Sequence, residues 1–198
     1  RHSIVNVLAG LPWCPELVGK LAIALFPVQV EDSGKAVPLH RCIRSFGSSG
    51  SGVGCVPRGM LQVLCDAYPF TASIPDPTSN GRLPLHVALA SGPQHSWEKS
   101  LVHLFASHPS SVAMDDPVTG LPAFCIASDA IAPIRDSQIE QAAKNMGNRS
   151  LCWYYLSKTE RLRAMEEARA FLECQKLTAM YEVLRRNPSV LDLDSPKT

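Results

Sequence analysis

Residues 81–92 read GRLPLHVALASG, and this stretch decides the fold that the sequence predicts. Pro84 suits the first turn of a helix, where the missing N–H of proline would have no partner in any case. Leu85, Ala88 and Leu89 then fall at positions i, i+3 and i+4, which share one face of a helix. A glycine followed by a proline ends that helix. The stretch therefore predicts a turn followed by a short amphipathic helix.

A second helix is predicted directly after the first, from about Ser96 to Ser107, with Ser96 as its N-cap. Leu101, Leu104 and Phe105 form its apolar face. A proline follows, so the unit consists of a turn, a short helix, a longer helix and a proline. Such a helix pair cannot cover its own apolar side, and it must therefore stack against neighbours.

The same order of residues occurs in three stretches, namely 25–43, 67–92 and 107–128. Each stretch has a proline after an apolar run, then a turn with aspartate and glycine, then a short helical start. The prolines are about 40 residues apart, at Pro27, Pro69 and Pro109. The same place at the start of the following helix is held by His40, His86 and Cys125. This recurrence predicts a helical repeat protein.

The two Pro-Leu-His stretches, GKAVPLHRCI (34–43) and GRLPLHVALASG (81–92), resemble the start of an ankyrin repeat. The resemblance covers roughly residues 20–127. It implies a mostly α fold of stacked helix-turn-helix repeats. The leucines of the second helices would be Leu61, Leu64, Leu101 and Leu104.

The chain also departs from the ankyrin pattern in three ways. Val37 or Leu83 stands where the family has a threonine, and the third copy has no Pro-Leu-His. The period near 40 exceeds the family's usual ~33 residues. The resemblance is therefore to a divergent ankyrin-like array.

The resemblance implies a non-enzymatic protein-binding or scaffolding module, without cofactor or metal. Exposed turn residues of such an array project from a rigid scaffold, so the turn tips and first-helix faces would contact another protein. The candidate contact residues are Thr78, Ser79, Asn80, Arg82, Val118 and Thr119.

The order of the segments predicts three parts. Residues 1–127 are expected to hold the repeats, with a Gly/Ser-rich loop at 45–59. That loop lacks the lysine of a phosphate-binding loop. Residues 128–176 are expected to form a helical insertion, and residues 177–198 the last repeat helix and a tail. A degenerate fourth repeat is the alternative to the insertion.

Two capping boxes predict helix starts within the insertion, one at Ser137 with Glu140 and one at Ser157 with Glu160. Residues 158–187 contain no Gly or Pro, which predicts one long helix or two joined helices. An apolar stripe would pack this helix on the side of the array, with a coiled-coil arm as the alternative. The stripe consists of Leu162, Met165, Ala168 and Leu172.

The composition gives no preference for nucleic acid or membrane. Of the 198 residues, 45% are hydrophobic and 19% are charged, and the net charge of +1 provides no bulk attraction to anionic partners. The apolar segment 4–30 is interrupted by prolines and charges, so we expect no membrane helix there.

The cysteines are odd in number and form no CxxC pair, which is typical of reduced thiols in an intracellular protein, cytoplasmic or nuclear. They are Cys14, Cys42, Cys55, Cys65, Cys125, Cys152 and Cys174.

Catalytic chemistry is the alternative to protein binding. Cys125 with His86 would resemble a thiol hydrolase pair, but equivalent positions in stacked units lie ~8–10 Å apart, well beyond hydrogen-bond distance. We expect His40 and His86 instead to join a turn to a helix start through ring hydrogen bonds. A thiol-dependent hydrolase or transferase site within 152–158 remains open, as does a regulatory domain of a larger chain. The other histidines lack the spacing of metal ligands.

Overall fold

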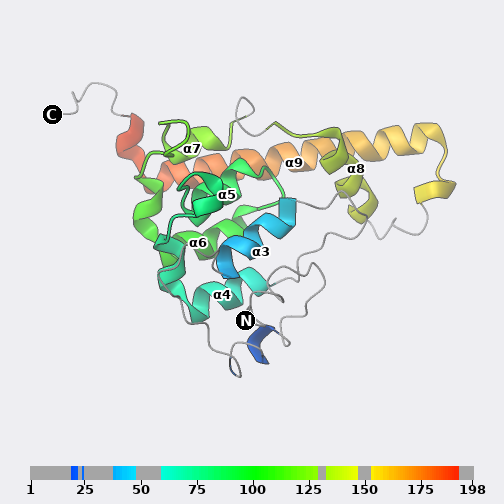
Figure 1. Cartoon of the computed structure of the whole chain (residues 1–198). Coiled ribbons are helices and arrows are strands. Elements are labelled where there is room, and N and C mark those ends of the chain that lie inside the picture. The colour runs from blue at the N-terminus through cyan, green and yellow to red at the C-terminus, as the bar shows by residue number, and fades with distance from the viewer. Residues whose placement is uncertain are drawn as a thin grey trace.

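The structure is a computed structural model, and it describes residues 19–21, 24, 38–47, 59–128, 133–146 and 153–191. These residues are mostly helical and include no β-strand, as the sequence predicts, although two isolated β-bridges are present. Figure 1 shows the arrangement. The α-helices are α3 (Pro38–Gly47), α4 (Met60–Ala67), α5 (Pro84–Ala90), α6 (Val102–Ser107), α7 (Ala123–Ile126), α8 (Asp136–Asn145) and α9 (Lys158–Arg186).

Shorter helical turns connect these helices. The 3-10 segments are η1 (Pro69–Ser73), η2 (Pro77–Ser79), η4 (Pro109–Val112), η6 (Trp153–Tyr155) and η7 (Pro188–Leu191), and η3 (Trp97–Leu101) is a π-helical turn. None of the helices in the described ranges is both long and apolar enough to cross a membrane.

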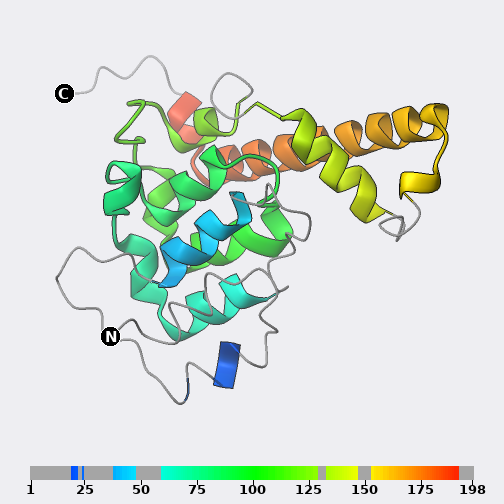
Figure 2. The ribbon, with the colours of Figure 1, turned by 45° about the vertical axis from the view of Figure 1, so that its right-hand side comes forward.

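The helices pack against one another in chain order. Helix α3 contacts α5, and α5 contacts α7; in a second row α4 contacts α6, and η3, which continues into α6, contacts α9. Figures 1 and 2 show these rows from two directions, with α9 beyond α6. Within each row, therefore, a helix packs against the preceding helix of the same row.

Helix α5 follows the sequence prediction closely. Leu83 is extended, Pro84 occupies the first turn, and Gly92 has φ 97° just after the helix. Because a left-handed backbone is strained for residues with a Cβ atom, glycine is suited to this position. The side chains of Leu85 and Leu89 are buried, so the predicted apolar face is confirmed.

The second helix begins where the sequence predicts but with a different geometry. Its first turn, Trp97–Leu101, is π-helical, and the side chain of Ser96 makes no capping hydrogen bond. Leu104 is buried, while Phe105 is half-buried beneath Arg186 of α9. The guanidinium of Arg186 lies 5.0 Å from the ring centroid of Phe105 and 4.3 Å from that of Trp97.

Three helices end in the same way. Tyr68, His108 and Asn187 have φ of −137°, −146° and −139° with ψ of 62°, 78° and 67°. A proline follows each of them and begins a 3-10 turn, at Pro69, Pro109 and Pro188. A residue before proline is sterically excluded from the α region, so the prolines end these helices. Segments η1, η4 and η7 line one edge of the molecule, at the left of Figure 1.

The buried side chains form two cores. The main core joins α3 to α7 and receives Ala179 and Val183 from the end of α9. The second core lies between α8 and the start of α9, and its buried residues are Ile139, Ala143, Trp153, Ala164, Ala168 and Leu172. Helix α9 is one continuous helix that serves both cores. The predicted boundary between residues 176 and 177 lies inside it, where the helix passes from the second core to the main core.

The buried stripe of α9 differs in part from the predicted one. Leu162 is exposed, whereas Ala164 is buried beside Ala168 and Leu172. The reason is that α9 faces α8 with its small residues, which allow the two helices to approach closely. The stripe packs inward, so this face of α9 is not the seam of a free coiled-coil arm.

One of the two predicted capping boxes is confirmed and the other is wrong. The hydroxyl of Ser157 accepts from the N–H of Glu160, and the carboxylate of Glu160 accepts from the N–H of Ser157 at 2.8 Å. Helix α8, however, begins at Asp136, and the side chain of Gln138 caps the N–H of Arg135 at 2.9 Å.

The Gly/Ser-rich loop begins later than predicted, because α3 continues through Gly47. Residues 48–58 of that loop lie outside the described part of the chain, as do the predicted first-copy proline Pro27 and its turn.

Candidate protein-binding surface

Two turns project from the helical rows, and they contain all six predicted contact residues. In the first tip (Asp76–Arg82), the N–H of Asp76 donates to the carbonyl of Arg82 at 2.8 Å, and the N–H of Gly81 donates back to the carbonyl of Asp76 at 3.0 Å. Asn80 and Gly81 have φ of 55° and 79°, a conformation that asparagine and glycine adopt most readily. The backbone of the first tip is therefore closed on itself.

The carboxylate of Asp76 organises the first tip from within. It is buried and accepts from the N–H of Thr78 at 3.0 Å and from the hydroxyl of Ser79 at 2.7 Å. It also forms an ion pair with Arg44 of α3 at 2.6 Å. Burial alone would raise the pKa of Asp76, but the hydrogen bonds from Ser79, Thr78 and Arg44 outweigh burial and lower it.

The second tip (Asp115–Pro122) is organised in the same way. The N–H of Asp116 donates to the carbonyl of Leu121 at 2.8 Å, and Gly120 has φ 67°. The buried carboxylate of Asp116 accepts from the hydroxyl of Thr119 at 2.8 Å. It also receives two hydrogen bonds, both 2.8 Å, from the guanidinium of Arg82. Burial opposes ionisation, but the bonds from Arg82 and Thr119 outweigh it and lower the pKa of Asp116 to about 2.

These contacts fix the two tips one after the other. Arg44 of α3 holds the first tip through Asp76, and Arg82 of the first tip holds the second through Asp116. A bidentate arginine–carboxylate pair constrains orientation as well as distance. The tips are parts of the scaffold, not loose loops.

This arrangement divides the six predicted contact residues into two groups. The side chains of Thr78, Ser79, Arg82 and Thr119 bond within the protein. Asn80 and Val118 lie at the ends of the turns and are exposed, and Thr78 and Thr119 are exposed as well despite their internal bonds. Sequence reasoning did not foresee this division, because the ion pairs join residues 32 and 34 positions apart.

Exposed apolar side chains near the tips were missed at the sequence level. Met114 and Leu121 flank Val118 in and beside the second tip, and Phe70 is exposed on η1. Leu121 directly follows the turn glycine, the position that Arg82 holds in the first tip. An apolar residue within a polar turn is the signal that could have identified it.

The histidines of the Pro-Leu-His stretches join α3 and α5 to later segments of the chain. His40 Nε2 bonds the carbonyl of Ile74 at 2.8 Å, and His86 Nε2 bonds the carbonyl of Ser111 at 3.0 Å. Both rings thus reach the segment that leads into the next tip, whereas the sequence predicted a bond from the turn to the helix start. Burial lowers the pKa of both rings, so each is a neutral structural donor near pH 7.

Burial makes two of the described thiols harder to ionise. Burial raises the pKa of Cys65 to about 11 and also raises that of Cys125. A reactive cysteine requires a lowered pKa. Cys152, on which the alternative enzymatic site depends, lies outside the described residues. No group of three or more metal-ligating side chains occurs within the ranges that the structure describes.

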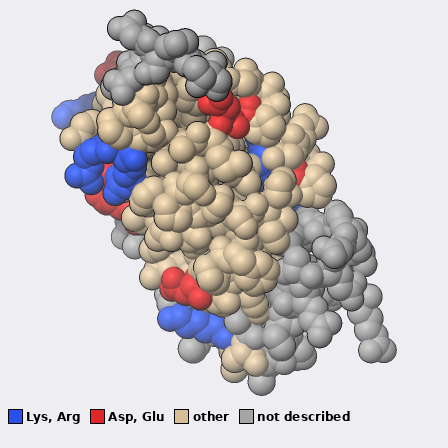
Figure 3. Space-filling view, turned by 90° about the vertical axis from the view of Figure 1, so that its left-hand side faces the viewer, with Lys and Arg blue, Asp and Glu red and all other residues tan. Residues whose placement is uncertain are grey.

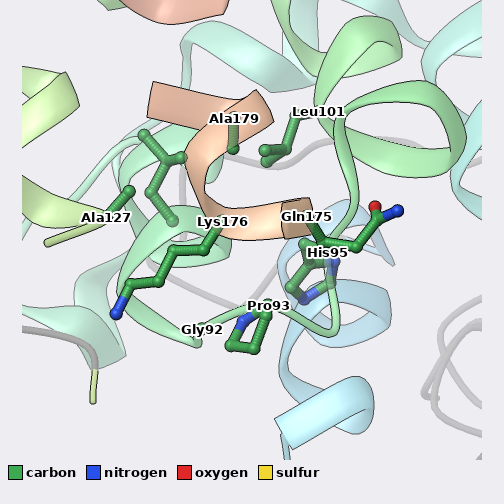
Figure 4. Close-up of a pocket in the computed structure, with 9 residues that line it drawn as sticks. Gly92, Pro93, His95, Leu101, Ala127, Gln175, Lys176 and Ala179 are labelled. Carbon is green, nitrogen blue, oxygen red and sulfur yellow. The ribbon is translucent and has the colours of Figure 1, made fainter. Parts of the chain in front are cut away.

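A pocket beside His95 and Lys176 is too small for a substrate. Its volume of about 10 Å³ is close to the space of one water molecule. Figure 4 shows the amino group of Lys176 directed away from the imidazole of His95. Burial lowers the pKa of His95 to about 4, against the opposing effect of a backbone hydrogen bond at Ile43. These two groups do not form an acid–base pair.

Comparison of the chain with protein-family models, with curated proteins and with solved structures gives no match.

Proposed function

We propose that the chain is a non-enzymatic protein-binding module of divergent ankyrin-like helix pairs, and that its two tips form the contact surface for another protein. The observation that carries this proposal is the pair of Arg–Asp clamps, which hold two projecting turns in a fixed relation. A preordered surface loses little conformational entropy when a partner binds.

The order of the helix contacts supports the repeat part of the proposal. The first helices α3, α5 and α7 contact one another in chain order. His40 and His86 make the same bond to the following unit, and Cys125 lies in α7, the next helix of the row. The helices that precede Pro69, Pro109 and Pro188 also end in one conformation.

The chemistry of the surface supports a protein as the partner. Met114, Val118 and Leu121 expose apolar side chains on and beside the second tip. Figure 3, which views the edge that carries η1, η4 and η7, shows mostly uncharged side chains with isolated basic and acidic groups. Such a surface suits an apolar and polar protein contact, whereas a nucleic-acid interface requires clustered Lys and Arg.

An intracellular location belongs to the same proposal. Among the described cysteines, Cys42, Cys65, Cys125 and Cys174 form no disulfide, and Cys42 and Cys65 are buried. Unpaired thiols are typical of reducing compartments.

The test is a pull-down from native cells with the full chain as bait. The double variant Asn80→Gly with Val118→Ala shortens one exposed side chain in each tip. Glycine keeps the positive φ at residue 80 without strain. The variant should retain the wild-type melting temperature but lose proteins that the wild type captures. The matched control, Leu162→Ala, removes an exposed leucine far from the tips along the chain. Capture of the same proteins in equal amounts by the tip variant would reject the proposed surface.

A further inference from the structure

The outward face of α9 carries a narrow apolar stripe that is separate from the two tips. We define the outer stripe as Ala170, Cys174, Leu177 and Tyr181, all four of which are exposed. Leu177 is 65% exposed and Tyr181 is 62% exposed. Leu177 and Tyr181 are four residues apart, so their exposed side chains are neighbours on one face of the helix.

The positions of these residues on the helix set them opposite the protein interior. At about 100° per residue, the four fall within about 60° of the helix circumference. The buried residues Ala168, Leu172, Ala179 and Val183 are centred about 180° away by the same geometry. The outer stripe is therefore a second packing face on a helix whose first face already serves the two cores.

The spacing of the outer stripe is that of a short coiled-coil seam. Its residues follow one another at intervals of four, three and four, which is the alternation of a and d positions in a heptad. This order reads the same in both directions along the helix. A second copy of α9 can run antiparallel to the first, related to it by a two-fold axis that passes between residues 175 and 176. In that arrangement the outer stripes of the two copies face each other.

We infer that the outer stripe of α9 binds a second copy of this chain, so that two copies form an antiparallel, two-fold symmetric dimer. In this arrangement Ala170 faces the partner's Tyr181, and Cys174 faces the partner's Leu177. Each layer pairs a small side chain with a large one, which is how facing helices interdigitate without voids or clashes.

The flanks of the stripe are compatible with this pairing. Phe171, which is 44% exposed, lies beside the stripe and would face the partner's Thr178. Glu173 lies on the other side and would face the partner's Met180, so the pairing does not set these glutamates against each other. Like charges placed directly opposite would disfavour association, and the two-fold arrangement avoids them here.

The association is tested by sedimentation equilibrium of the full chain, whose monomer mass is 21.5 kDa. The wild type should sediment as a dimer at about 100 µM. Leu177→Lys and, separately, Tyr181→Glu should each raise the dissociation constant by about 30-fold or more, because they place a charge in the seam. Leu162→Lys alters a leucine that is 52% exposed on the same helix but off the stripe, and it should leave the dissociation constant unchanged.

Disulfide trapping tests the orientation of the two helices. Leu177→Cys places a thiol opposite the partner's Cys174, so oxidised glutathione should convert this variant rapidly into a covalent dimer. Adding Cys174→Ser to that variant should abolish the cross-link. A monomeric wild type at about 100 µM would overturn the proposal, as would association that continues beyond a dimer. Rapid cross-linking of the wild type through Cys174 alone would also overturn it, because it requires an orientation or register other than the inferred one.

Discussion

The main core and the second core differ in how many elements they join. The main core draws side chains from α3 through α7 and from the end of α9, so each helix is covered on more than one side. Among the described residues, the second core has six buried side chains, and three of them are alanines. Buried apolar area is the dominant favourable term in folding, so the second core contributes much less. The α8–α9 pair therefore depends on the main core for its stability.

The largest effect should come from a change in the main core. Leu104→Ala removes a leucine that is 1% exposed and leaves a cavity among α4, α5 and α6. We expect a loss of about 3–4 kcal/mol in the free energy of unfolding, measured by urea denaturation. Hydrogen exchange should accelerate in both cores, because the second core relies on the first. Loss of protection confined to α6 would contradict that dependence.

The matching change in the second core should remain local. Ile139→Ala truncates a side chain that is equally buried between α8 and α9. We expect a loss of about 2–3 kcal/mol of local stability, with faster hydrogen exchange in α8 and at the start of α9. Protection of α5 and α6 should not change. An equal acceleration throughout the chain would show that the two cores unfold as one unit.

The Arg82–Asp116 clamp should make the stability of the fold sensitive to acid. Because the pKa of Asp116 is lowered from 3.8 to about 2 in the folded state, its stabilisation is fully present above about pH 5 and is lost as the pH falls toward 2. This contribution is roughly 2 kcal/mol. Urea denaturation at pH 5 and pH 2.5 should show a smaller acid loss in Asp116→Asn than in the wild type. Equal losses in the two proteins would exclude this role for Asp116.

The smallest effect should come from the helix cap at Ser157. Ser157→Ala removes the hydroxyl that accepts from the N–H of Glu160 at the start of α9. We expect a loss of about 1 kcal/mol, limited to the first turns of α9 and measured by hydrogen exchange. Thr159→Ser, which keeps the hydroxyl that bonds the Ser157 hydroxyl at 3.1 Å, is the control. A comparable effect in the control would mean that the cap is not responsible.

Local signals predicted the helix pairs well. Prolines ended the helices at Tyr68 and His108, and the capping box at Ser157 marked the start of α9. Such signals act over a few residues, so sequence spacing is enough to detect them. The apolar face of α5 was predicted for the same reason.

Tertiary contacts determined the features that local sequence signals did not predict. Leu162 belongs to the predicted stripe of α9 but is exposed, because the small side chains of Ala164 and Ala168 set the approach of α8. The capping box at Ser137 was displaced by Gln138, whose amide also donates to the side chain of Gln94 at 2.6 Å. Four predicted tip residues also bond within the protein, because Asp76 and Asp116 accept hydrogen bonds from them. These contacts depend on which helices become neighbours in the fold, and that cannot be read from a single sequence.

The unbroken course of α9 has a mechanical consequence. At about 1.5 Å per residue, its 29 residues form a helix about 43 Å long between Ser157 and Asn187. Tyr154 and Tyr155 precede α9 and are exposed. At its C-terminal end, the guanidinium of Arg186 lies over the ring of Trp97. Because α9 is continuous, a displacement of its tyrosine end would be transmitted along the helix to the end that packs on the rows of short helices.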